Sequence, residues 1–238
     1  MSLPVFFIEL PADPGEIITL PEEASRHIVQ VLRMTTGESI QLSDGKGNLS
    51  TATIISDHKK KCSVRIVTTD TIAPLERTIT IAISLLKNAS RFEWFLEKAT
   101  EIGIQQIVPL LCERTERQHF RHERMNNILV SAMLQSQQAW LPVLHQPIAY
   151  EQFFREEDTA LPAQKFIAHC LDEVKTPLNK AVDPSLPSQL ILIGPEGDFT
   201  AAEIELALGH HFVPVTLGET RLRAETAGIV AAALLRLG

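Results

Sequence analysis

The chain has 238 residues, of which 45% are hydrophobic and 5% aromatic, and its formal net charge is −7. This length and apolar content are enough for either one large domain or a large and a small one, each with its own core. The negative charge argues against general attraction to nucleic acid, because phosphate contacts need clustered lysine and arginine.

The composition also argues against membrane insertion and disulfide bonding. The longest apolar stretches, Ile79–Leu86 and Gly228–Leu235, are far shorter than a bilayer crossing and are flanked by charge. Residues 1–10 lack the basic and apolar regions of a signal peptide, so a cytoplasmic protein is expected. The three widely separated cysteines, Cys62, Cys112 and Cys170, predict reduced, buried thiols.

Residues 1 to about 71 predict a small β-rich module. Short β-type runs separated by turn signals occur at Val5–Glu9, Ser39–Leu42, Leu49–Ser56 and Cys62–Thr68. One helix is expected between Ala24 and Leu32, where apolar residues recur at helical spacing, and it would cover or plug a small barrel. The irregular, proline-containing stretch 70–77 indicates a boundary between two domains, 1–71 and 72–238.

From residue 78 onward, apolar strands alternate with helices. The expected strands are Thr78–Leu86, Gln106–Leu111, Lys165–His169, Gln189–Gly194 and Val213–Leu217. The expected helices are Asn88–Gly103, Arg121–Gln138, Ala201–Leu208 and Ala224–Leu237. This alternation is typical of a parallel sheet covered by helices, so the second domain is expected to be α/β with a mostly parallel sheet.

Two glycine turns near the C-terminus are candidates for a ligand site. Gly194-Pro195-Glu196-Gly197 and Leu217-Gly218 each follow an expected strand. Ligands of open α/β sheets bind beyond the carboxyl ends of the strands, so the two turns are expected to form one site. Thr200 and Glu203 are expected to form a capping box at the next helix. A purely structural role as tight turns is the alternative.

The sequence lacks several common catalytic and nucleotide-binding patterns. It contains no GxGxxG, P-loop, GxSxG or HExxH pattern, which leaves nicotinamide, nucleoside triphosphate, serine-hydrolase and zinc-protease chemistry without support. No metal site is expected.

Two charged segments have open interpretations. The stretch 219–227, ETRLRAETA, places two arginines and two glutamates at the start of an otherwise apolar helix. They either form ion pairs within the loop or place an arginine against an anionic reactant. The stretch 113–124, ERTERQHFRHER, is either a solvated helix face or a contact for an RNA backbone.

Four segments, LIGPEGDFT, LGETRLRAETA, FEWFLEKATEIGIQQIVPL and SAMLQSQQ, together resemble the RsmE family of SPOUT-class methyltransferases, and the resemblance covers almost the whole chain. It implies an N-terminal PUA-like β-barrel for RNA recognition and a C-terminal SPOUT α/β domain with a deep trefoil knot. It further implies S-adenosylmethionine as cofactor and N3 of a specific uridine in 16S rRNA of the small ribosomal subunit as the target.

The resemblance also assigns site residues. It implies cofactor contacts at His169, Ile193, Gly194, Pro195, Glu196, Gly197, Leu217, Gly218, Leu222 and Thr226. It implies that Arg223 stabilises the negative charge that develops on the uracil during methyl transfer. For Glu225 two roles stay open: it either orients Arg223 or removes the N3 proton. RNA contacts are expected at Arg26, Arg33, Lys59, Lys60, Lys61, Arg114, Arg117 and Arg121.

The resemblance implies a homodimer through the knot helices, with Ala227–Leu235 and the stripe of the Ser131–Gln138 helix facing a partner subunit. The sequence departs from the family pattern at two places. Arg221 stands one position later than the usual arginine, and Gln138 stands where an arginine is common. The alternative functions are a non-catalytic RNA-binding assembly factor, or a related methyltransferase acting on another rRNA or tRNA position.

Overall fold

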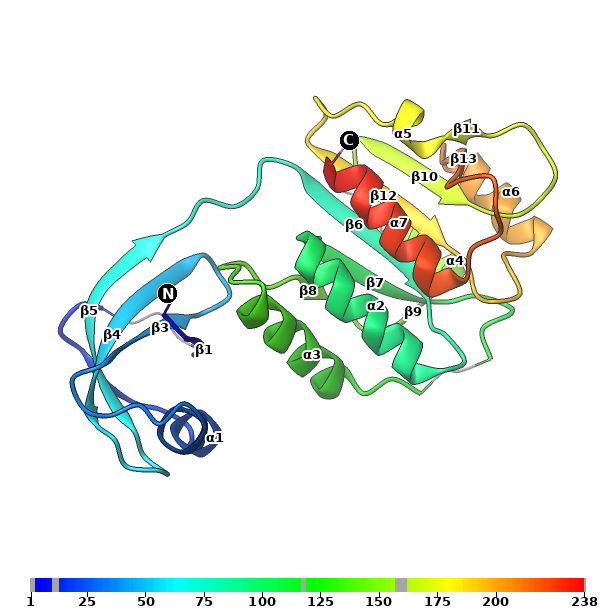
Figure 1. Ribbon diagram of the computed structural model, residues 1–238. Helices are drawn as coiled ribbons and strands as arrows, with labels where there is room; N and C mark the ends of the chain where they lie inside the picture. The colour runs from blue at the N-terminus through cyan, green and yellow to red at the C-terminus, as the bar shows by residue number, and fades with distance from the viewer. Residues whose placement is uncertain (1–2, 10–12, 117–118, 157–161, 238) are drawn as a thin grey trace. The chain divides into compact units, whose positions relative to one another are not determined.

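The structure is a computed structural model that describes residues 3–9, 13–116, 119–156 and 162–237 (Figure 1). Its internal contacts divide the chain into two compact units. The first unit consists of Met1–Pro74 with Met133–Leu141, and the second of Leu75–Ala132 with Pro142–Gly238. Within the described residues, no helix has the length and apolar character needed to cross a membrane.

The first unit contains a five-stranded sheet with the order β1-β3-β4-β5-β2. Its strands are β1 (Val5–Phe7), β2 (Ile17–Thr19), β3 (Ser39–Ser43), β4 (Asn48–Ser56) and β5 (Ser63–Thr71). β1 pairs with β3 in parallel, and the other pairings are antiparallel. The four predicted strands are all present, whereas β2, with three residues, is too short to give an alternating pattern.

The predicted helix of this unit is present but is not uniformly α-helical. α1 (Glu22–Arg26) continues into a π-helical turn, η1 (His27–Val31). Ile28 on this turn is fully buried in the core of the sheet. Helix and sheet are also joined through the Ser25 hydroxyl, which donates to the Leu20 carbonyl and accepts from the Cys62 backbone N–H at 2.9 Å.

A later segment of the chain, Met133–Leu141, completes the first unit. The Gly47 backbone N–H donates to the Ala139 carbonyl at 2.9 Å, and the Trp140 indole N–H donates to the Ile72 carbonyl at 2.9 Å. A Cβ atom on Gly47 would lie 2.6 Å from the Trp140 ring, so this close approach requires glycine. The first unit therefore includes residues from within the stretch 72–238.

The second unit contains an eight-stranded sheet with the order β11-β13-β10-β12-β6-β7-β8, and β9 pairs with β7 beside this path. Its strands are β6 (Thr78–Ser84), β7 (Gln106–Leu111), β8 (Val143–Leu144), β9 (Ile148–Ala149), β10 (Gln164–Ala168), β11 (Thr176–Pro177), β12 (Ser188–Ile193) and β13 (Val213–Thr216). The pairings among these strands are parallel, which confirms the predicted α/β class.

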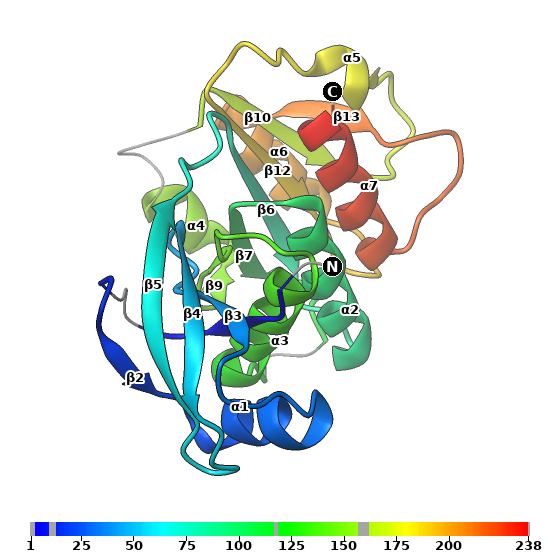
Figure 2. The same ribbon diagram turned by 60° about the vertical axis from the view of Figure 1, so that its left-hand side comes forward.

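Helices cover both faces of this sheet. The helices that follow residue 75 are α2 (Ala89–Ile102), α3 (His122–Gln135), α4 (Tyr150–Glu156), α5 (Leu178–Ala181), α6 (Ala201–Gly209) and α7 (Ala224–Leu237), and the end of α3 from Met133 onward belongs to the first unit. Helices α2 and α7 lie side by side on one face, with α4 and α6 on the other (Figures 1 and 2). The central strands are consequently buried on both faces, which explains their continuous apolar sequence.

The ends of the main helices follow the sequence signals. The Asn88 side chain accepts from the Ser90 backbone N–H at 2.9 Å, and Gly103 ends α2 with φ at 89°. The predicted capping box at α6 is confirmed, because the Glu203 carboxylate accepts from the Thr200 N–H at 2.8 Å while the Thr200 hydroxyl accepts from the Glu203 N–H at 3.3 Å.

The prediction that all three cysteines are buried is wrong for Cys170. Cys62 and Cys112 lie in the cores, but Cys170 is exposed. Cys170 follows the carboxyl end of β10, where the chain leaves the sheet and enters a loop.

Candidate active site

Two adjoining cavities lie at the carboxyl edge of three neighbouring parallel strands in the second unit. β10, β12 and β13 end at Ala168, Ile193 and Thr216, and Ala168 pairs with Ile193 on one side and with Val215 on the other. The first cavity has a volume of about 310 Å³ and the second about 460 Å³. They share the lining residues Ala168, Cys170, Arg221, Leu222 and Ala227.

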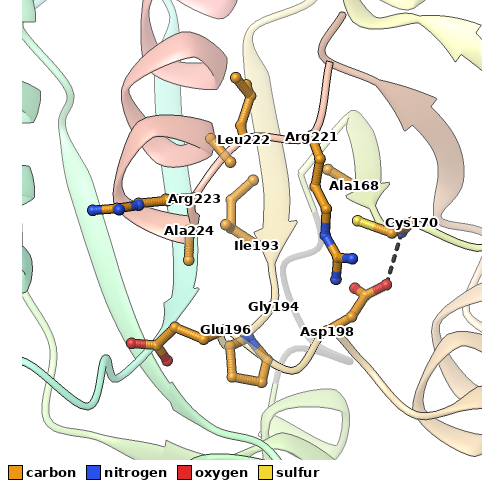
Figure 3. Close-up of a pocket in the computed structure, with 12 residues that line it drawn as sticks. Ala168, Cys170, Ile193, Gly194, Glu196, Asp198, Arg221, Leu222, Arg223 and Ala224 are labelled. Atoms are coloured by element: carbon orange, nitrogen blue, oxygen red, sulfur yellow. Dashed lines mark hydrogen bonds between the residues drawn. The ribbon is translucent and has the colours of Figure 1, made fainter. Parts of the chain in front are cut away.

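The first cavity lies beside the glycine turn that follows β12 (Figure 3). Of the predicted site residues, it is lined by Ile193, Gly194, Pro195, Glu196, Leu222 and Arg223. Sequence reasoning left the role of Arg221 open and did not single out Ala168, Cys170, Asp198, Ala224 or Ala227. Asp198 directly follows the glycine turn within the quoted motif, and this position is the signal that could have identified it.

The second cavity lies between the loop that follows β10 and the loop that follows β13. The predicted residues His169, Leu217, Gly218 and Leu222 line it. Further lining residues are Leu171, Asp172, Glu173, Lys175, Val215, Thr216, Glu219 and Thr220. The two glycine turns therefore border adjoining cavities, as their positions after the strands predicted. Gly197 and Thr226 are not among the described residues that line either cavity.

The turn after β12 is held by contacts from three directions. A Cβ atom on Gly194 would lie 3.1 Å from the Phe199 ring, so the turn is closely packed. The Glu196 carboxylate accepts from the Lys87 backbone N–H at 3.1 Å, and the Arg114 guanidinium donates to the Gly197 carbonyl at 2.7 Å. Arg114, predicted as an RNA contact, thus supports the turn.

Asp198 connects the loops that follow β10 and β12. Its carboxylate accepts from the Cys170 backbone N–H at 2.8 Å through Oδ2 and from the Phe199 N–H at 2.9 Å through Oδ1. The backbone of Asp198 is left-handed, with φ at 63°, a conformation that aspartate and asparagine tolerate better than most residues. These bonds fix the carboxylate at the wall of the first cavity.

The two arginines of the segment before α7 point in different directions (Figure 3). The Arg221 side chain extends toward Asp198, and Arg221 lines both cavities. The Arg223 side chain extends away from Asp198, although Arg223 also contributes to the lining of the first cavity. The arginine that departs from the family pattern is therefore the one that reaches into the site.

The Glu225 side chain is buried beside α2, whereas Arg223 lines the first cavity. Glu225 is 6% exposed, and its Oε1 lies 3.6 Å from Nε of Arg91 on α2. Its Oε2 is buried and has no hydrogen-bond partner within the described part of the chain. Glu225 is also not among the described residues that line the two cavities. Its charged neighbour is therefore Arg91 and not a ligand in either cavity.

The His169 side chain is fully buried, and its backbone carbonyl accepts from the Lys175 ammonium at 2.7 Å. Burial, and then the positive charge of Lys175, lower the pKa of the imidazole below its usual value. Nε2 lies 3.0 Å from a Glu173 carboxylate oxygen, but the geometry of this contact is not that of a hydrogen bond. Burial of the ring thus favours the neutral imidazole.

The cations predicted to contact RNA divide between the units. In the first unit, Lys59, Lys60 and Lys61 are exposed in the turn between β4 and β5, and Arg33 is exposed with φ at 56°. Arg26 and Lys60 both contact the Glu22 carboxylate, at 2.6 Å and 3.6 Å. In the second unit, Arg121 donates to the His119 ring at 3.2 Å. Arg117 lies outside the described residues.

Comparison with known protein families agrees with this architecture. Residues 73–236 match the profile of the RNA methyltransferase domain, and residues 20–67 match that of the RNA methyltransferase PUA domain. The parallel sheet, the cavities at its carboxyl edge and these two matches define an RNA methyltransferase that carries an N-terminal PUA domain.

A curated relative gives the particular family. The chain is 34% identical to the ribosomal RNA small subunit methyltransferase E of Synechocystis sp. over 221 residues, which cover 91% of this chain and 71% of the relative. The chain belongs to the ribosomal RNA small subunit methyltransferase E family, which is the RsmE family indicated by the motifs.

Two solved structures have the same fold. A ribosomal RNA small subunit methyltransferase E from Neisseria gonorrhoeae, bound to S-adenosyl methionine, is 29% identical with a TM-score of 0.86, covering 99% of this chain and 98% of that chain. A methyltransferase from Legionella pneumophila, in complex with the bound cofactor SAM, is 30% identical with a TM-score of 0.88, covering 100% and 98%.

Proposed function

We propose that this protein transfers the methyl group of S-adenosylmethionine to N3 of a uridine in 16S rRNA of the small ribosomal subunit. The observation that carries the proposal is the meeting of the two glycine turns at adjoining cavities beyond β10, β12 and β13. Relatives with the same fold bind the same cofactor, as their names state. The relatives from Synechocystis sp. and Neisseria gonorrhoeae are named as methyltransferases of small-subunit ribosomal RNA.

The residues present fit such a cofactor. Each cavity lies within the range of about 300 to 1,000 Å³ that is typical of small-molecule sites. Gly218 leaves the backbone open at the wall of the second cavity, since nothing lies within 4 Å of an added Cβ there, and Leu217 and Leu222 offer apolar contacts to an adenosine. When bound, S-adenosylmethionine supplies an electrophilic methyl group on its sulfonium.

Arg223 is the proposed stabiliser of negative charge on the uracil carbonyl oxygens during transfer. Its side chain is exposed and extends from the first cavity toward solvent, where a base extruded from RNA can reach it. Because Glu225 is buried against Arg91, we assign it the positioning of the α7 start and not proton removal from N3. Loss of methyl transfer in Arg223→Ala with unchanged cofactor affinity tests the assignment of Arg223.

RNA docking is assigned to both domains, 1–71 as the RNA-binding PUA domain and 72–238 as the catalytic domain. The exposed Lys59–Lys61 turn and Arg33 provide positive charge on the first unit, and Arg121 does so on the second. An alanine triple variant of Lys59–Lys61 is expected to weaken binding to the small subunit, with a reduced dependence on salt concentration. Unchanged binding would show that Lys59–Lys61 are not part of the surface that docks on RNA.

The proposal includes a trefoil knot and a homodimer. The segment between β13 and α7 lines the same cavities as the loops that follow β10 and β12, and the closeness of this late segment to two earlier loops supports the proposed knot. Half-buried apolar residues of α7, namely Ile229, Val230, Ala233 and Leu234, offer a surface to a second copy. Sedimentation analysis that finds only monomers would contradict the dimer.

The test of the function is mass spectrometry of 16S rRNA from cells without this protein. We expect the loss of one N3-methyluridine, restored by the wild-type gene and not by Arg223→Ala. Loss of a different modification would identify another target nucleotide. An unchanged rRNA, with no binding of S-adenosylmethionine in calorimetry, would favour a non-catalytic assembly factor acting in the cytoplasm.

A further inference from the structure

We propose that Arg221 and Asp198 form a charged clamp for the amino-acid end of S-adenosylmethionine, in which Arg221 binds its carboxylate and Asp198 its ammonium group. The inference rests on the proposed function, since it concerns how the methyl donor is held. It assigns a role to the arginine at which this sequence departs from its family and to an aspartate that the motifs did not single out.

Arg221 is placed to contact a ligand in either cavity. It lines both, and its guanidinium points toward Asp198 across the first cavity (Figure 3). Within the described part of the chain, the guanidinium has neither a hydrogen bond nor an ion pair at 4.0 Å or less. Its five N–H donors are therefore available for a carboxylate, which an arginine can bind through two parallel hydrogen bonds.

Asp198 is fixed before any ligand arrives. Two of the roughly four acceptor sites of its carboxylate are used by the backbone N–H groups of Cys170 and Phe199, at 2.8 Å and 2.9 Å. The remaining acceptor sites are available to a cation in the first cavity, which Asp198 lines. Since the carboxylate is already ordered, binding an ammonium group there costs little side-chain entropy.

The charges match the ends of the methyl donor. Its adenosine is uncharged at neutral pH, whereas its amino-acid end carries one carboxylate and one ammonium group close together. The other two charged residues of the first cavity fit this end less well. The side chains of Glu196 and Arg223 both extend away from Asp198 and Arg221 (Figure 3).

Calorimetry with two ligands tests the clamp. S-adenosylhomocysteine carries the amino-acid end, and 5′-methylthioadenosine lacks it but keeps the adenosine. We expect Arg221→Ala and Asp198→Asn each to weaken S-adenosylhomocysteine binding about tenfold, or about 1.4 kcal/mol, and to leave 5′-methylthioadenosine binding unchanged. Arg155→Ala is the matched control, since it removes an exposed arginine of α4 that lies outside both cavities.

The other outcomes are distinguishable. If the wild type binds neither ligand, the proposed function itself fails. If Arg221→Ala binds S-adenosylhomocysteine normally, the clamp is wrong; reduced methyl transfer to the small subunit in that variant would then assign Arg221 to the RNA. Equal losses for the two ligands would also overturn the clamp, because they would indicate damage to the whole pocket.

Thermal melting and one further variant guard against misfolding. Asparagine tolerates the left-handed backbone of Asp198 but has one acceptor oxygen where aspartate has two. Asp198→Asn is therefore expected to lose one of the two backbone hydrogen bonds and to lower the melting temperature by only a few degrees. Arg221→Lys keeps the charge but not the two-pronged geometry, and is expected to restore part of the affinity that Arg221→Ala loses. If Asp198→Asn does not fold, the two Arg221 variants with both ligands decide the question alone.

Discussion

The Arg91 guanidinium and the Glu225 carboxylate form an ion pair across the contact between α2 and α7, with Nε and Oε1 3.6 Å apart. The Glu225 side chain is 8% exposed, whereas the Arg91 side chain is 38% exposed. A buried carboxylate of this kind depends on its cationic neighbour, since the second oxygen has no other partner in the described residues.

Removing Arg91 should therefore destabilise the second unit. We expect Arg91→Ala to lower the free energy of unfolding by about 1 to 3 kcal/mol, less than for a fully buried pair because Arg91 is partly exposed. Urea unfolding measures this, with Arg155→Ala as a control that should change stability by less than about 0.5 kcal/mol. If Arg91→Ala has normal stability but has lost methyl transfer, the ion pair contributes to the reaction and not to folding.

Gly228 on α7 should not tolerate a larger side chain. A Cβ atom there would lie 2.7 Å from the Phe95 ring and 3.1 Å from a methyl group of Ile83. Gly228→Ala is expected to destabilise the protein by about 1 to 3 kcal/mol through overpacking between α7, α2 and β6. The matched control is Gly209→Ala in α6, where nothing lies within 4 Å of the added Cβ and a small gain of stability is expected. Equal effects of the two substitutions on thermal unfolding would contradict this account.

The exposed thiol of Cys170 should report on cofactor binding. Iodoacetamide is expected to modify Cys170 in the native protein, because it is the exposed cysteine, and to modify all three cysteines after unfolding. Burial raises the pKa of the Cys112 thiol to about 12, which keeps that thiol unreactive. Since Cys170 lines both cavities, S-adenosylhomocysteine should slow its modification. Mass spectrometry of the labelled peptides gives the rate, and an unchanged rate at saturating ligand would argue against binding there.

Asp44 should make the first unit sensitive to acid. Burial acts to raise the pKa of its carboxyl, but hydrogen bonds from the Asn48 side chain and from the backbone of Lys46 and Asn48 outweigh it and lower the pKa below 3.8. The carboxylate therefore stabilises the fold above about pH 4, and this contribution is lost as the pH falls through the lowered pKa.

The comparison of Asp44→Asn with wild type isolates this contribution. The variant is expected to melt at a lower temperature at pH 7 and to lose less stability than the wild type between about pH 4 and pH 2. Asp57→Asn, at an exposed position of the same unit, is the control and should follow the wild type. Parallel melting curves for wild type and Asp44→Asn over this range would show that the hydrogen bonds do not stabilise the charged form.

Local signals along the chain determined most of the main elements. β7 has the predicted bounds Gln106–Leu111, and α7 has the predicted bounds Ala224–Leu237. These elements were predictable because apolar periodicity and capping residues act within a few positions of one another. The elements between Val143 and Ala181 that went unpredicted, β8, β9, α4, β11 and α5, have at most seven residues each, too few to show a period.

The sequence by itself also determined the class of protein, through motifs that resemble those of a known family. It determined the position of the two glycine turns as well, because a glycine turn that follows a strand lies at the carboxyl edge of a parallel sheet. Only the tertiary structure decided which charged side chains belong to the site. Arg221 and Arg223 are two positions apart with the same chemistry, yet one points toward Asp198 and the other away from it. Glu225 is in the same motif but is buried against Arg91. Side-chain direction depends on neighbours from distant segments, here α2 and the loops that follow β10 and β12, and spacing along one motif does not contain that information.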